Sequence, residues 1–73
     1  MLAREMRTLS TEELQRRLEE SSRELYALRQ RKASGRLEDT TRIKAVKRDI
    51  ARIKTILRER ELIEEVMHGE GAA

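Results

Sequence analysis

Two runs of aliphatic residues recur along this chain at alternating steps of three and four, the spacing that places side chains on one face of an α-helix. The first run is weak at Ser21 and ends at Lys32, whereas the second is unbroken. The runs consist of Leu14, Leu18, Leu25 and Leu28, and then of Ile43, Val46, Ile50, Ile53 and Leu57. The spacing predicts two amphipathic helices and no strand.

The stretch LSTEEL has the features of a helix start. Ser10 can cap the helix, and Glu13 follows three residues later, as in a capping box. Leu9 before the cap and Leu14 after it are placed as a hydrophobic staple. The first helix is therefore predicted to begin just after Ser10.

The stretch SGRLEDTT, residues 34–41, is the only turn-like cluster inside the chain. Gly35 follows the end of the first aliphatic run and is suited to stop a helix, because glycine adopts the left-handed conformation at low cost. Asp39 or Thr40 can cap the second helix. About six residues thus connect the two helices.

The fold class predicted is all-α, an antiparallel two-helix hairpin with a short N-terminal lead-in. The helices are expected at about 11–33 and 40–65 within one domain, residues 1–66. MHGEGAA has two glycines and no periodicity, so 67–73 is predicted to be a flexible acidic tail. With the turn centred near Arg36, the expected partners are Leu28 with Ile43 and Val46, Leu25 with Val46 and Ile50, and Leu18 with Ile53 and Leu57.

The charge is strongly divided along the chain. Residues 1–30 have six basic and six acidic side chains, and residues 31–60 have eleven basic and four acidic ones, a net charge of +7. Residues 61–73 have four Glu and no Lys or Arg, so the total of +3 conceals a strongly basic middle. Such asymmetry favours a polyanionic partner.

At 100° per residue, five cations of the second helix fall within an arc of about 120° on one flank of the aliphatic stripe. They are Lys44, Lys47, Arg48, Lys54 and Arg58. Ala51 and Thr55 lie in the middle of the arc, where small side chains would let a phosphate backbone approach, and Arg52 lies at its margin. The tip gathers Arg29, Arg31, Lys32, Arg36 and Arg42. The alternative is an ordinary solvated face.

Nothing in the sequence supports catalysis or metal binding. His68 stands alone near two glycines, and no Cys is present, so no metal site and no cofactor are expected. The serines lack a base in a triad-like arrangement, and a two-helix hairpin offers no pocket for a substrate. Tyr26, about 100° off the stripe, is expected to be a half-buried surface residue, or else to pack on a partner or a base.

No apolar run approaches the roughly 18 residues of a membrane span, and MLAREMRTLS lacks the apolar core of a signal peptide. The absence of Cys fits a reducing compartment. A cytoplasmic protein is therefore expected.

Residues 25–60, LYALRQRKASGRLEDTTRIKAVKRDIARIKTILRER, resemble the L-twenty-nine family of large-subunit ribosomal proteins. The family pattern runs Leu-x-x-Leu-Arg-Phe-Gln-x-Ala-x-Gly-Gln-Leu, then Arg-Ile, then basic-basic-x-Ile-Ala-Arg-Ile-x-Thr. The matching positions are Leu25, Leu28, Arg29, Ala33, Gly35, Leu37, Arg42, Ile43, Lys47, Arg48, Ile50, Ala51, Arg52, Ile53 and Thr55. The chain departs from the pattern at Gln30, Arg31 and Arg36, which stand for Phe and two Gln.

The resemblance implies a structural constituent of the large ribosomal subunit, a monomer within the ribosome that binds ribosomal RNA near the polypeptide exit tunnel. It also implies a neighbouring protein of the L-twenty-three family and proximity to factors that meet nascent chains. By resemblance, the RNA-facing family positions are Arg29, Gly35, Arg42, Lys47, Arg48, Arg52 and Thr55.

Two other functions remain open from the residues alone. The three-four spacing also suits a protein-interaction module, either a coiled coil or a hairpin that binds an acidic partner, although Ser21, Lys32 and Arg60 interrupt the heptads. A helix lying on a membrane surface would need Trp or Phe at its apolar boundary, and the chain has neither.

Overall fold

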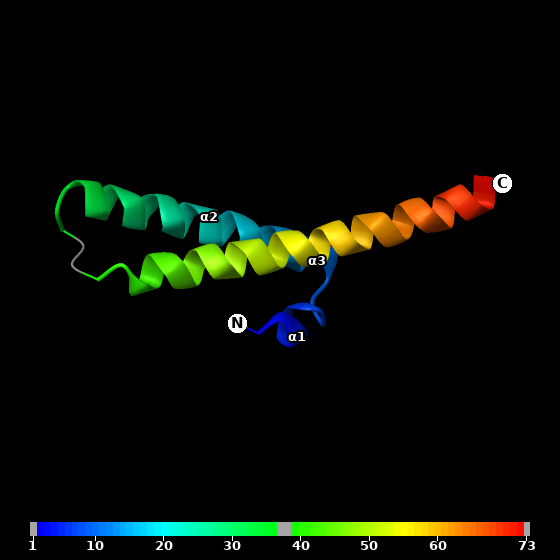
Figure 1. The fold of residues 1–73 in the computed structure, drawn as a ribbon, viewed down its shortest axis with the longest axis horizontal. Coiled ribbons are helices and arrows are strands. Elements are labelled where there is room, and N and C mark those ends of the chain that lie inside the picture. Colours follow the sequence, from blue (N-terminus) through cyan, green and yellow to red (C-terminus); the bar gives the residue numbers. More distant parts are fainter. Residues whose placement is uncertain (1, 37–38, 73) are drawn as a thin grey trace.

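The computed structural model describes residues 2–36 and 39–72. It contains three helices, α1 (Ala3–Met6), α2 (Thr11–Ala33) and α3 (Thr41–Ala72). Helices α2 and α3 run antiparallel side by side, and α1 packs on α3 (Figure 1). The molecule is elongated, at 57 × 21 × 16 Å. The predicted all-α hairpin is confirmed.

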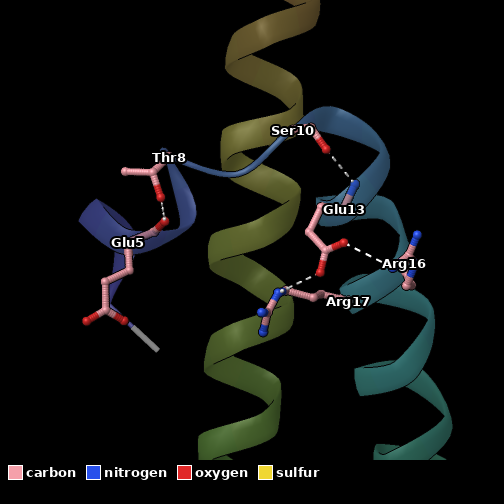
Figure 2. A network of polar contacts seen from close by, with 6 residues as sticks. All are labelled: Glu5, Thr8, Ser10, Glu13, Arg16 and Arg17. Atoms are coloured by element: carbon pink, nitrogen blue, oxygen red, sulfur yellow. Dashed lines mark hydrogen bonds and ion pairs between the residues drawn. The ribbon is translucent and has the colours of Figure 1, made fainter.

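Helix α2 begins where its cap predicts. The Ser10 hydroxyl accepts a hydrogen bond from the Glu13 backbone N–H at 3.1 Å, which satisfies one of the free donors of the first turn (Figure 2). The Glu13 carboxylate lies 3.2 Å from Arg16 Nη1 and 3.5 Å from Arg17 Nε. The carboxylate of the expected capping box thus contacts two arginines one turn further along.

Helix α2 ends at Ala33 through a glycine in the left-handed conformation. Gly35 has φ +75, and its N–H donates to the Lys32 carbonyl at 3.1 Å. The Arg36 N–H donates to the Arg31 carbonyl at 2.9 Å, which completes a Schellman motif. The predicted stop at Gly35 is therefore confirmed, and its cause is backbone conformation.

Asp39 caps the start of α3. Its Oδ1 accepts hydrogen bonds from the Thr41 hydroxyl at 2.6 Å and from the Thr41 N–H at 2.9 Å. These bonds favour the ionised carboxylate and, with the charge of Lys44, lower the pKa of Asp39 below its ordinary value of 3.8. The charge and the cap reinforce each other at this helix start.

The expected end of the second helix near residue 65 was wrong, because α3 continues to Ala72. No proline interrupts this stretch, and each glycine in a helix costs only about 1 kcal/mol relative to alanine. Leu62, Ile63, Val66 and Met67 also extend a helical apolar spacing beyond the part of α3 that faces α2. The proposed division into a domain, 1–66, and a tail, 67–73, stays a prediction.

The core consists of two clusters along the seam between α2 and α3. Near the turn, Leu28, Ile43 and Val46 are buried, and Leu25 and Ile50 pack against them. At the other end the buried residues are Met6, Leu14, Ile53 and Ile56, with Leu9, Leu18 and Leu57 packed against them. The predicted partners fall in the same clusters, so the register of the hairpin is confirmed.

Helix α1 contributes a core residue that the aliphatic pattern did not reveal. Met6 is 1% exposed and packs with Leu14, Ile53 and Ile56. Ile56, which lies off the predicted stripe, is 2% exposed because α1 widens the covered side of α3. The lead-in is therefore part of the fold.

Arg60 holds the connection between α1 and α2 against α3. Its guanidinium donates to the Leu9 carbonyl at 2.7 Å, to the Arg7 carbonyl at 3.3 Å and to the Thr11 hydroxyl at 3.1 Å. A planar guanidinium is suited to these three hydrogen bonds because it presents several donors in fixed directions. Arg60 thus has a structural role that the sequence did not suggest.

Candidate nucleic-acid interface

The side of α3 that faces away from the core carries the basic flank, defined as Lys44, Lys47, Arg48, Lys54 and Arg58, and all five side chains are exposed. Lys47, Arg48 and Lys54 form no salt bridge with any residue that the structure describes. Three neighbouring cations without carboxylate partners repel one another, and a polyanion on this flank would relieve that repulsion.

Small side chains interrupt the basic flank. Ala51 and Thr55 are exposed, and the Thr55 hydroxyl donates to the Ala51 carbonyl at 2.9 Å. This bond ties the hydroxyl to its own helix, so the surface between the cations is low and smooth. A phosphate backbone could approach α3 at this gap while Lys47 and Arg48 reach around it.

The basic flank ends at a charge reversal. Arg58 Nη1 lies 3.0 Å from Glu61 Oε2 and 3.9 Å from Glu65 Oε1. Arg52, at the margin of the flank, is half-buried and lies 3.9 Å from Asp49. These two arginines are therefore partly compensated within the chain, unlike Lys47 and Lys54.

The hairpin tip presents a second group of cations. Arg29, Arg31, Lys32 and Arg36 are exposed around Gly35. Arg42 is different, because its Nε donates to Glu24 Oε1 on α2 at 2.6 Å. The structure thus brings the predicted tip residues together but gives Arg42 a carboxylate partner across the helices. Gly35 provides the left-handed backbone conformation that ends α2, and its contact with RNA stays a prediction.

A small hollow lies where residues of α1, α2 and α3 meet. It has a volume of about 80 Å³ and is lined by Met6, Arg17, Glu20, Ser21, Asp49 and Ile53. Ligand pockets usually measure about 300–1,000 Å³, so this hollow is too small for an organic substrate. Within the described part of the chain, no group of three or more His, Asp or Glu residues is placed to hold a metal ion.

Over the same described ranges, no helix has both the length and the apolar character needed to cross a membrane.

Sequence comparison places the chain among known proteins. The family model described as Ribosomal L29 protein matches residues 4–60. The chain belongs to this family. The match spans α1 except its first residue, all of α2 and the portion of α3 that forms the hairpin, and it includes the whole basic flank. Residues beyond Arg60 lie outside it.

Individual relatives agree with the family model. The large ribosomal subunit protein uL29 of Thermotoga petrophila is 58% identical over 62 residues, which cover 85% of this chain and 94% of that protein. The uL29 protein of Clostridioides difficile is 52% identical over 64 residues, 88% of this chain and 96% of that protein. The Geobacillus stearothermophilus protein of the same name is 50% identical over 62 residues.

Proposed function

We propose that the chain is a structural constituent of the large ribosomal subunit that binds ribosomal RNA through the basic flank of α3 and the hairpin tip. The relatives are named as large-subunit proteins, which supports the proposal that this chain is part of the large ribosomal subunit. The observation that carries the RNA contact is the exposed, uncompensated group of Lys47, Arg48 and Lys54. Phosphates would neutralise this group with charge-assisted hydrogen bonds.

The full set of residues proposed to contact RNA includes the flank, its margin and the tip. The set is Arg29, Arg31, Gly35, Arg36, Arg42, Lys44, Lys47, Arg48, Arg52, Lys54, Thr55 and Arg58. Arg48 has a planar fork suited to bidentate phosphate contact, whereas Lys47 and Lys54 act as point charges. We propose no catalytic role and no cofactor.

The family resemblance also supports a proposal about the position within the subunit. We propose that the hairpin lies near the polypeptide exit tunnel in the cytoplasm, beside a protein of the L-twenty-three family and close to factors that meet nascent chains. The hairpin would be a monomer there. Its two helices already bury Leu14, Leu28 and Ile53 against each other, so the seam that a coiled-coil dimer would need is occupied.

Salt dependence tests the RNA contact. Binding of the full chain to large-subunit ribosomal RNA is measured by filter retention over a series of salt concentrations. If the basic flank and Arg52 contact phosphates, the slope of log affinity against log salt should be on the order of −4 to −5, because each contact contributes about −0.7 to −0.9. A slope near zero would contradict the proposal.

Charge reversal locates the contact. Lys47→Glu together with Arg48→Glu should flatten the slope by about two contacts' worth while helicity by circular dichroism stays unchanged. The matched control is Arg16→Glu with Arg23→Glu, two exposed arginines of α2 that give the same change in net charge. Equal losses from the two pairs would show that net charge, and not the flank of α3, governs binding.

A further inference from the structure

Beyond Arg60, α3 leaves the hairpin body. Its orange and red C-terminal part extends past the start of α2 (Figure 1). We call residues 61–67 the α3 overhang. Its apolar side chains are exposed, with Leu62 at 45%, Ile63 at 61%, Val66 at 60% and Met67 at 67%. Burial of these side chains in a partner would be favourable, since it would remove their apolar surface from water.

These four side chains form one surface. At 100° per residue they fall within an arc of about 140°, and they line a single shallow, largely apolar hollow. No residue of α1 or α2 is among the residues that line it. Contiguous exposed apolar surface of this kind marks interaction sites more often than isolated side chains do.

Carboxylates border the apolar stripe on both edges. On the helix, Glu64 lies about 60° beyond Met67, and Glu65 lies about 60° beyond Leu62. No Lys or Arg follows Arg60 in the sequence. Arg58 approaches Glu65 only at 3.9 Å, so a partner's cation could take its place. The overhang is therefore an apolar stripe between two negative edges.

We propose that the α3 overhang binds a protein helix whose own aliphatic stripe is bordered by Lys and Arg. The apolar stripes would pack together, and cations on both borders would meet Glu64 and Glu65 in the manner of flanking charges in a coiled coil. A contact built on four side chains is far smaller than a standard interface, so the complex should be weak and transient.

Charge argues against the other occupants. A second copy of the overhang would bring carboxylates against carboxylates, because both edges of the stripe are acidic. RNA and anionic membrane surfaces would be repelled by the same edges. The overhang also lies outside the family match, 4–60, and shares no residue with the proposed RNA contact.

The probe is a synthetic amphipathic peptide of leucine and lysine, labelled at one end, with a leucine–glutamate peptide of the same pattern as its counterpart. Fluorescence anisotropy with the full chain should show binding of the lysine peptide only. Ile63→Ser with Val66→Ser should weaken that binding by at least about tenfold. Tyr26→Ser is the control, since Tyr26 is 67% exposed on α2 and should leave binding unchanged.

Removal of the acidic edges provides the second measurement. Glu64→Gln with Glu65→Gln should weaken binding of the lysine peptide and reduce the salt dependence of that binding. Ile63→Ser with Val66→Ser should lower the affinity for the peptide without changing its salt dependence. Neither pair of substitutions should weaken binding to ribosomal RNA. Failure of the proposed peptide contact can therefore be distinguished from failure of the proposed RNA contact.

Four results would overturn the proposal. The glutamate peptide could bind as well as the lysine peptide, or the Ile63 and Val66 changes could leave peptide binding intact. Sedimentation could instead show a dimer that the same two substitutions abolish, which would assign the stripe to a second copy. Anionic vesicles could also bind in a manner that these substitutions abolish, which would assign the stripe to a lipid surface.

Discussion

Thr55 and the cations around it lie on one face of α3 but have different roles in the proposed RNA contact. Lys47 and Arg48 are cations without a carboxylate partner in the described structure, whereas Arg58 is partly compensated by Glu61. Thr55 contributes no charge and occupies the low surface between the cations. A flank that only attracts phosphate would gain from a cation at that position, but a flank fitted to an RNA backbone would not.

Thr55→Arg separates the two possibilities. We expect the substitution to weaken RNA binding although it adds a positive charge, because the long side chain would fill the gap through which the backbone approaches α3. Thr55→Val keeps the branched shape and loses only a hydroxyl already bonded to Ala51, so affinity should change less than about twofold. Filter binding at fixed salt measures both. Tighter binding by Thr55→Arg would leave only an unspecific basic helix.

At the scale of the elements, the sequence predicted those features that depend on residues close together along the chain. Ser10 and Gly35 predicted both ends of α2, because a cap and a left-handed glycine act within a few residues of the helix end. The aliphatic spacing predicted the seam and its register. The basic flank was also predictable, since a helical period and a list of cations are enough to place it.

The remaining features depend on contacts between residues far apart in the sequence. Helix α1 has four residues and no periodicity, and it is held by Met6 in the far cluster and by Arg60 at the connection. The pair of Arg42 with Glu24 depends on how α2 and α3 are rotated about each other. Such pairings require the assembled structure, because no spacing along the chain encodes them.

Met6→Ala tests whether α1 is part of the core. The substitution removes a fully buried side chain above Ile53 and Ile56, so the free energy of unfolding should fall by about 2–4 kcal/mol. Leu2→Ala is the control, because Leu2 is 53% exposed at the same end of the chain, and its effect should stay within about 0.5 kcal/mol. Urea titration followed by circular dichroism measures both. Equal effects would mean that α1 does not cover α3.

At the scale of the whole molecule, α3 changes charge along its length. The basic flank occupies the part that packs on α2, and the acidic overhang follows directly after it. The net charge of +3 averages over this reversal and so describes neither end. Arg58 lies at the boundary, where Glu61 and Glu65 reach back toward it. The overhang should therefore limit how far RNA follows the helix.

Glu61→Gln with Glu65→Gln tests that limit. Removal of both carboxylates leaves Arg58, which Glu61 and Glu65 otherwise share with the phosphate, fully available to that contact. RNA binding should therefore tighten, and its log–log salt slope should steepen by up to about 0.7 to 0.9, the full contribution of one contact. Glu12→Gln with Glu19→Gln changes the net charge equally on α2 and should tighten binding less, with no change of slope. Filter retention over the same salt series compares the two pairs. If both pairs tightened binding equally at an unchanged slope, the whole charge of the molecule would govern the interaction, and the boundary at Arg58 would have no role.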